Sequence, residues 1–184
     1  MPSCSAQTTS VAPFSPPSGT QIVEAIAVAE RGDRVSRRDR DWPRRLRFDF
    51  DSLQGFEAVD RAFAGWGIGF KNAIALQPSN AAFPTRSTQN VLMGAPEPGA
   101  IEIEFDRPIA WAMAYITASR RTVLTAEVGG EIVDRAELPE ANLAGRDRPI
   151  APNALLQVRG TAIDRLTFYG FEGQFTLSEL CVGF

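Results

Sequence analysis

The chain contains no histidine, and this limits the chemistry that its side chains can perform. Ser-His-Asp and Cys-His catalytic arrangements, histidine-ligated metals and histidine proton shuttles all need an imidazole. Glu102 and Glu104 form a pair of carboxylates two residues apart. On a strand both share one face, and with Ile101 and Ile103 on the other face they indicate a solvated surface instead of an acid–base pair. The sequence therefore predicts a protein that is not an enzyme.

The two cysteines, Cys4 and Cys181, lie near opposite ends of the chain and lack the spacing of a metal site. We interpret Cys181 as a small hydrophobic residue on a strand and Cys4 as part of a flexible tail. A disulfide between them stays open as an alternative in an oxidising compartment.

Four aromatic residues are candidates for stacking against a sugar ring: Trp66, Trp111, Tyr115 and Tyr169. Trp111 lies in the apolar run IAWAMAYI, on the face shared by Ile109 and Met113, so we expect it in the core. Trp66 stands between two glycines, a looser setting that favours exposure, although the glycines fit a tight bend or bulge equally well. We therefore take Trp66 and Tyr169 as the candidate ligand-binding aromatics.

The elements that must position these residues are short strands. Candidate strands follow one another at 46–51, 66–76, 89–93, 100–105, 109–117, 122–128, 131–138, 155–159, 164–170 and 175–184. Their connections carry Gly and Pro, and the pair Gly129-Gly130 between two alternating runs is a strong hairpin signal. The last segment alternates up to the final residues, which indicates a strand held inside a sheet. The sequence predicts an all-β fold, an antiparallel, jelly-roll-like β-sandwich over residues 46–184.

Residues 1–45 read as an N-terminal arm. The first 19 residues are rich in Pro, Ser and Thr, a composition typical of a segment without regular structure. From about Thr20 to Arg31, the capping-box spacing of Ser18 and Gln21 and the helical spacing of apolar residues predict a short helix. The β-branched residues of the same stretch also permit a strand.

An arginine-rich connector follows at residues 31–47, where eight arginines and three aspartates give a net charge of +5. The chain from Phe48 onward carries a net charge of −6. The connector is either a solvated linker or a docking segment for an anionic surface, namely its own β-domain, a partner protein or lipid headgroups at a membrane surface. The candidate docking residues are Arg37, Arg38, Trp42, Arg44 and Arg45. The sequence pI of about 5.1 argues against nucleic acid as a partner.

Two long loops are candidate recognition surfaces. The loop 139–153 contains Asn142, Arg146, Asp147 and Arg148, and the loop 77–89 is the second. Long loops at the rim of a sandwich commonly carry binding residues. We therefore include these four side chains among the candidate ligand-binding residues.

The order of the segments resembles a known type of module. FDFDSL (48–53), GWGIGF (65–70), FDRPIAWAMAYI (105–116), TVLTAEVGGEIV (122–133), AIDRLTFYG (162–170) and FTLSEL (175–180) are similar to the jelly-roll, galactose-binding-like modules of bacterial surface proteins, including PEP-CTERM-type exported proteins. The resemblance covers residues 46–184, and the sorting tail of that type is absent. It implies carbohydrate binding and a structural calcium held by Asp49, Asp51 and Glu179. Alternation offers another interpretation, with Asp49 and Asp51 on a solvated strand face opposite Phe48 and Phe50.

The function expected from the sequence is a non-catalytic binding or accessory module, which docks into a larger protein assembly through its arm and rim loops. The alternative is a carbohydrate-binding module of a bacterial surface or exported protein. No secretory signal and no membrane-spanning stretch is visible, so the protein stays inside the cell unless a signal was removed upstream of this numbering.

Overall fold

The computed structural model describes residues 22–26, 43–94, 99–145, 149–171 and 173–184. Of the predicted site residues, Arg37, Arg38, Trp42, Arg146, Asp147 and Arg148 lie outside these ranges, as does Cys4. The strands are β1 (Val23–Ile26), β2 (Arg45–Asp49), β3 (Ile68–Lys71), β4 (Ala73–Leu76), β5 (Val91–Gly94), β6 (Ala100–Ala118), β7 (Thr122–Val128), β8 (Glu131–Leu138), β9 (Ala154–Gly170) and β10 (Phe175–Gly183). Two short 3₁₀ helices cover Phe50–Ser52 and Ala64–Trp66. No described helix is long and apolar enough to cross a membrane.

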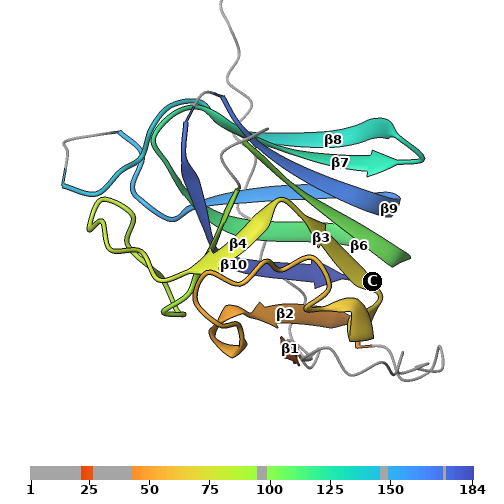
Figure 1. Ribbon diagram of the computed structural model, residues 1–184. Coiled ribbons are helices and arrows are strands. Elements are labelled where there is room, and N and C mark those ends of the chain that lie inside the picture. Colours follow the sequence, from red (N-terminus) through yellow and green to blue (C-terminus); the bar gives the residue numbers. More distant parts are fainter. Residues whose placement is uncertain (1–21, 27–42, 95–98, 146–148, 172) are drawn as a thin grey trace, which may run out of the picture.

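The strands form a two-layer β-sandwich, which confirms the predicted fold class (Figure 1). One layer has the order β1-β2-β10-β6-β9, and β4 and β5 extend it beside the start of β10. The other layer has the order β3-β6-β9-β7-β8. The long strands β6 and β9 contribute to both layers, and their mutual register shifts between Glu104 and Trp111, where they pass from one layer to the other.

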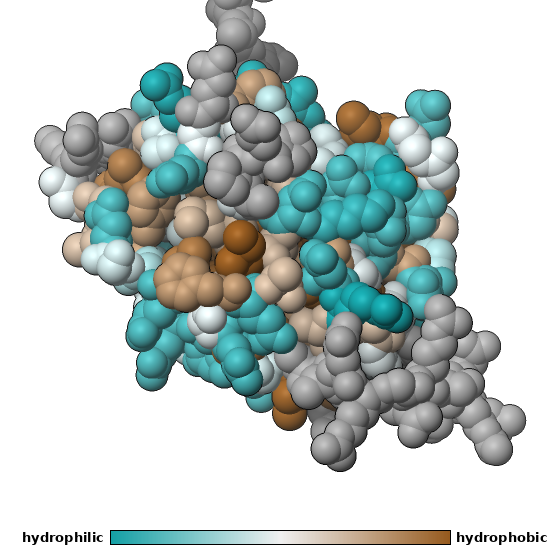
Figure 2. All heavy atoms as spheres, viewed as in Figure 1, coloured by the Kyte–Doolittle hydropathy of each residue, from teal (hydrophilic) through white to brown (hydrophobic). Residues whose placement is uncertain are grey.

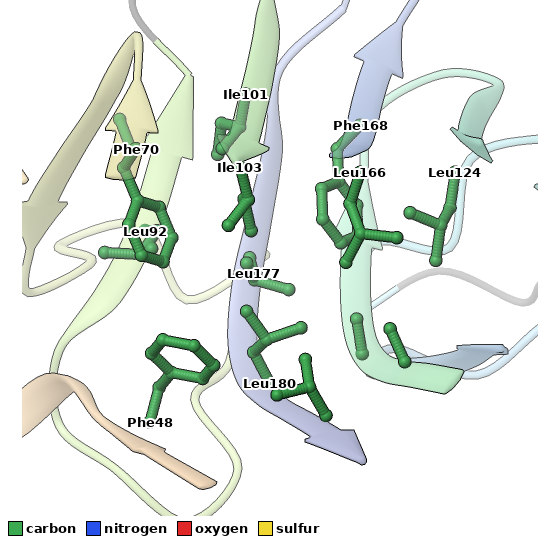
Figure 3. Close-up of a cluster of buried hydrophobic side chains, with 14 of the residues drawn as sticks. Phe48, Phe70, Leu92, Ile101, Ile103, Leu124, Leu166, Phe168, Leu177 and Leu180 are labelled. Carbon is green, nitrogen blue, oxygen red and sulfur yellow. The ribbon is translucent and has the colours of Figure 1, made fainter. Parts of the chain in front are cut away.

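The core lies between the layers, and Figure 3 shows its apolar side chains pointing toward one another from both sides. Phe48 from β2 and Leu180 from β10 belong to one layer, whereas Phe70 from β3, Leu124 from β7 and Phe168 from β9 belong to the other. Phe48 makes edge-on contacts with the rings of Phe63 and Phe70 at centroid distances of 5.0 and 5.7 Å. Burial of these alternating residues is what drives the two layers together.

Local sequence signals explain most element boundaries. The hairpin of β7 and β8 turns at Gly129 and Gly130, whose φ angles of 59° and 89° are the positive values that a type I′ turn requires. The candidate strands at 100–105 and 109–117 are one strand, because Pro108 lies exposed in an irregular stretch of β6 and does not interrupt it. The segments 155–159 and 164–170 join into β9 in the same way.

The short helix expected from about Thr20 to Arg31 is wrong for its described residues. Val23–Ile26 form a strand that pairs in parallel with Leu46–Asp49 of β2. Ala25 is fully buried against the core, and the indole N–H of Trp66 donates to the carbonyl of Ile26 at 3.3 Å. Pairing with the sheet edge and burial of Ala25 outweigh the capping signal of Ser18 and Gln21.

The surface turned to the viewer in Figure 2 is hydrophilic around a patch of hydrophobic residues, which lies over the region of β4 in Figure 1. The most exposed aromatic side chain of the described residues is Phe56, whose N–H donates to Ala75 of β4 and whose φ is 65°. A large side chain in this left-handed conformation is strained.

Candidate binding surface

One layer of the sandwich presents a row of large side chains away from the core. Along β6, Ala112, Ala114 and Ile116 point inward and are buried, so Trp111, Met113 and Tyr115 point outward. We call this side of the β2-β10-β6-β9 layer the outer face. It contains Arg45, Arg47, Glu179, Cys181, Trp111, Met113, Tyr115, Leu155, Gln157 and Arg159.

The register of the four strands sets these side chains in three transverse rows. Arg45, Gly183, Trp111 and Arg159 make the first row, and Arg47, Cys181, Met113 and Gln157 make the second. Glu179, Tyr115 and Leu155 make the third. The two middle strands therefore carry the aromatic and sulfur-containing side chains together with Glu179, and the arginines, Gln157 and Leu155 lie on the flanking strands β2 and β9.

Trp111 lies on the outer face and not in the core, which corrects the prediction from the sequence. Ile109 is buried, and the pairing of β6 with β9 shifts register between Ile109 and Trp111. A bulge at this point reverses which residues face inward, so Trp111 no longer shares the side of Ile109. The indole is half-buried and lies directly against Gly183, where its Nε1 atom leaves no room for a Cβ.

Tyr115 is held under the loop 77–90 by a network of charges. The guanidinium carbon of Arg86 lies 3.7 Å from the centre of the Tyr115 ring, a cation–π contact. Arg86 and Arg47 both reach the Glu179 carboxylate, with N···O distances of 3.3 and 3.2 Å. Arg47 also donates to Ser87, whose hydroxyl donates to Glu179. The network fixes the loop, and with it one side of the outer face.

Asp49, Asp51 and Glu179 are the residues that would hold the calcium implied by the resemblance. One oxygen of Asp51 accepts the N–H groups of Gln89 and Asn90 at 2.8 Å, and Asp49 accepts the N–H of Asp51. Glu179 is occupied by the two arginines. The described residues contain no group of three or more acidic or cysteine side chains that could hold a metal ion. In this structure these carboxylates take hydrogen bonds and ion pairs from the chain itself, and calcium binding stays a prediction.

A polar hollow of about 260 Å³ lies between β1, β2 and the end of the loop 77–90. Glu24, Arg47, Asp49, Asp51, Ser87 and Thr88 line it, together with Phe48. Arg47 stands 3.6 Å from Glu24 as well as beside Glu179, so it connects this hollow to the outer face.

Of the remaining predicted ligand residues that the structure describes, two are buried and one is exposed. Trp66 is only 7% exposed and packs in the core, so it is not the exposed aromatic that its two glycine neighbours suggested. Asn142 is fully buried. Its side-chain oxygen accepts the N–H of Ala118, and its side-chain nitrogen donates to the carbonyl groups of Ile116 and Ala151. Asn142 therefore stabilises the loop and does not reach a ligand. Tyr169 is 39% exposed, as the stacking hypothesis requires.

Tyr169 belongs to a second aromatic site, at the end of β9 in the other layer. Its ring meets Phe171, which is 37% exposed, edge-on at a centroid distance of 4.7 Å. The guanidinium of Arg121 lies over Phe171 at 4.5 Å and makes two hydrogen bonds to Glu137. The hydrogen bonds from Arg121 are the main cause that lowers the pKa of the Glu137 carboxyl below its usual 4.5. We call Tyr169, Phe171, Arg121 and Glu137 the aromatic rim.

Glu102 and Glu104 are ion-paired on the outward side of this same layer. Lys71 lies 2.8 Å from Glu104 and 3.9 Å from Glu102, and Arg165 lies 3.3 Å from Glu104. The hydrogen bond from Lys71 lowers the pKa of the Glu104 carboxyl. A general acid would need a raised pKa and a free proton at neutral pH, so the arrangement suits a structural role.

Cys181 is a free, half-buried thiol in the second row of the outer face. Burial, and after it the Glu179 carboxylate, raises the pKa of this thiol to about 11. The raised pKa makes the thiol unreactive, but its row neighbours include the polar side chains of Arg47 and Gln157, so the strand face is not the apolar one that the sequence suggested.

No family model matches the chain, and no curated protein does. Among solved structures it is similar to the K2 cleaved adhesin domain of Lys-gingipain, with 13% identity, 76% of this chain and 99% of that chain covered, and a TM-score of 0.47. It is also similar to the K1 cleaved adhesin domain of Lys-gingipain from Porphyromonas gingivalis W83, with 10% identity, 75% and 96% coverage and a TM-score of 0.38. A third similar structure is TmCBM61 in complex with β-1,4-galactotriose, with 7% identity, 71% and 94% coverage and a TM-score of 0.32.

The resemblance seen in the sequence is confirmed as far as the β-sandwich architecture. At these identities and TM-scores, the similar structures assign neither a ligand nor a binding site to this chain. The link to PEP-CTERM-type exported proteins, and with it an exported location, stays a prediction.

Proposed function

We propose that this chain is a non-catalytic binding module that docks a protein partner on its outer face. The observation that carries the proposal is the outward row Trp111, Met113 and Tyr115 on β6. Trp, Tyr, Met and Arg are the residue types enriched at protein interfaces, and Trp, Tyr and Arg dominate binding hot spots. All four types meet on this one face.

The geometry of Trp111 supports this role. Gly183 has no side chain, so the Trp111 indole approaches the backbone of β10 closely and is fixed by packing against it. A rigid aromatic group loses little conformational entropy when a partner covers it. Tyr115 is similarly fixed by Arg86 and the loop 77–90.

The arginine-rich connector extends the same surface. Arg45, a predicted docking residue, is buried at the start of β2 in the first row beside Gly183 and Trp111, whereas Arg44 next to it is exposed. The connector therefore enters the domain at the Trp111 end of the outer face. Arg37, Arg38 and Arg44 would add contacts to acidic groups of a partner and Trp42 would add an aromatic contact, and docking of the chain into a larger assembly through them belongs to this proposal.

The test uses the full chain in the cells that produce it, with a photo-activated diazirine amino acid at Met113 on the outer face or at Thr125 on the opposite layer. The proposal expects one crosslinked protein of defined mass from position 113 and none from position 125. Trp111→Ala should remove that crosslink at unchanged expression level. A crosslink at position 113 that survives Trp111→Ala, or that appears equally at 125, would contradict it.

Carbohydrate binding is the second candidate function, and the aromatic rim is the observation that favours it. Tyr169 and Phe171 expose ring area beside a guanidinium and a carboxylate that are already fixed, and aromatic rings with nearby fixed polar groups suit a pyranose ring. A glycan array with the full chain tests it. Glycan binding that disappears in Tyr169→Ala but persists in Trp111→Ala would assign the sugar to the aromatic rim. An array without any signal would contradict carbohydrate binding.

A further inference from the structure

The first half of β9 forms an open edge of the sandwich. Within the described residues, Leu155, Leu156, Gln157 and Val158 pair with β6 on one side, and no strand pairs with them on the other. The partner of β9 in the other layer, β7, begins its pairing only at Arg165. An unpaired edge is a template for another strand.

The direction of the backbone groups on this edge follows from Arg159. Its N–H donates to the side chain of Asp134 on β8 at 2.7 Å, so it points away from β6. Backbone groups alternate along a strand, and the N–H and C=O groups of Leu155 and Gln157 therefore point outward from the same edge. At Arg159 the Asp134 carboxylate occupies the place that a carbonyl of a neighbouring strand would take.

Exposed apolar side chains occur on β9 and on the neighbouring strand β8. Leu155 is 45% exposed, and Ile132 and Val133 of β8 are 61% and 48% exposed. Val133 lies close to the bend of β9, because a Cβ added to Gly160 would stand 3.0 Å from its Cγ2 atom. In addition, the side-chain nitrogen of Gln157 is buried without a hydrogen-bond partner among the described residues. A buried unsatisfied amide carries a free-energy cost, which a rearrangement of the Gln157 side chain on binding would relieve.

We propose that a second copy of this chain covers the edge, and that two copies form a symmetric dimer through antiparallel pairing of residues 154–158. A twofold axis at Leu156 sets Leu155 opposite Gln157 of the second copy and Ala154 opposite its Val158. Outward-pointing residues then meet outward-pointing residues, and core-facing residues meet core-facing residues, as a C₂ contact requires. Leu155 and Gln157 would exchange four main-chain hydrogen bonds between the copies.

The proposed register also suits the side chains that it brings together. The segment 154–158 contains no charged residue, so two copies meet without like-charge repulsion. The two Gln157 side chains become diagonal neighbours across the axis. The outer edge of β8, by contrast, carries Glu131, Asp134, Arg135 and Glu137 in the pattern that keeps edges from pairing.

The dimer joins the two β2-β10-β6-β9 layers into one continuous sheet, with both outer faces on the same side. This inference does not rest on the proposed function, because Trp111 and Tyr115 take no part in the contact. If both hold, the dimer presents two docking faces at once and binds a repetitive partner with increased avidity.

Sedimentation of the full chain over a range of concentrations tests the dimer. Leu155→Pro removes one outward N–H in each copy but no hydrogen bond within the chain, so it should keep the melting temperature within a few degrees and raise the dimer dissociation constant by at least about tenfold. Leu155→Lys should also break the dimer, whereas Ile26→Lys, an exposed apolar residue on the β1 edge, should leave it intact. A monomer at every concentration, or a dimer broken by Ile26→Lys and not by Leu155→Lys, would overturn the proposal.

Disulfide trapping tests the register. In a Cys4→Ser, Cys181→Ser background, the double variant Leu155→Cys, Gln157→Cys should oxidise to a covalent dimer, because each cysteine faces its counterpart in the second copy. Leu155→Cys with Arg159→Cys is the matched control, since these positions do not oppose each other in the proposed register. A control that crosslinks as fast as the test pair would refute the register.

Discussion

The indole of Trp111 and the backbone of Gly183 touch across two strands, so the two positions should respond to mutation together. Gly183→Ala places a methyl group where the indole lies, and overpacking of this kind costs about 1–3 kcal/mol. Thermal unfolding measures the loss. Gly69→Ala on β3 is the matched control, because an added Cβ there meets nothing within 4 Å, and it should be nearly neutral. Equal melting temperatures for both variants would mean that Trp111 does not pack on Gly183.

Trp111→Ala itself should cost less than a core tryptophan. The indole is half-buried on the outer face, so we expect a loss of about 1–2 kcal/mol in chemical denaturation, below the roughly 3–5 kcal/mol of a buried Trp. A loss of about 3–5 kcal/mol would indicate that the Trp111 side chain lies in the core, and it would contradict the bulge at residues 109–111.

Glu104 gives a prediction about pH. Its folded-state pKa lies below the usual 4.5, mainly because Lys71 donates a hydrogen bond to it, so its contribution to stability is present above about pH 4.5 and is lost as the pH falls further. Glu104→Gln should therefore be less stable than the wild type at pH 7, by no more than about 1 kcal/mol because the pair is exposed, and the difference should vanish in acid. Glu131→Gln, in the exposed hairpin, is the control. A difference that persists unchanged at pH 3 would contradict the ion pair.

Single residues also mark the limit of what the sequence could tell. Gly65 and Gly67 correctly indicate a tight turn, and Gly67 has a φ of 63°, but a turn signal says nothing about whether Trp66 faces the core or the solvent. The run IAWAMAYI is apolar on both sides, so its alternation could not decide between the Trp111 side and the Ala112 side. Only the irregular pairing after Ile109 decides it, and that pairing depends on β9.

At the scale of elements, β7 and β8 follow from local sequence, whereas β1 does not. The hairpin needs only two alternating runs and two adjacent glycines. β1 has four residues, and its state depends on the β2 edge and on Trp66, 40 residues away in the chain. Helix signals upstream could not weigh that distant contact.

The attachment of β1 can be tested at Ala25. Ala25→Asp would bury an unpaired carboxylate against the core, so β1 should leave the sheet and Trp66 should become exposed to water, with a red shift of tryptophan emission. Ile22→Asp is the matched control, because Ile22 is exposed beside the strand, and it should leave the emission unchanged. The same spectrum for both variants would show that β1 does not depend on the burial of Ala25.

For the whole molecule, the alternating pattern and the Gly- and Pro-containing turns were enough to predict a sandwich, because burial of one face of each strand is a property of the sequence itself. The position of the binding surface was not predictable in this way. The outer face gathers Arg45 from β2, Trp111 from β6, Gln157 from β9 and Cys181 from β10, which only the strand order brings together. The loop 139–153, predicted as a recognition surface, supplies Asn142 to the interior.

Partner capture by outer-face variants is the most direct test of the central claim. The full chain, Trp111→Ala and Tyr169→Ala would be purified from the producing cells at equal expression, and the amount of co-purifying partner per chain would be quantified by mass spectrometry. The account predicts that Trp111→Ala loses at least about tenfold of its partner, the effect of removing a hot-spot aromatic, while Tyr169→Ala keeps it. Full retention of the partner by Trp111→Ala would show that the outer face is not the docking surface.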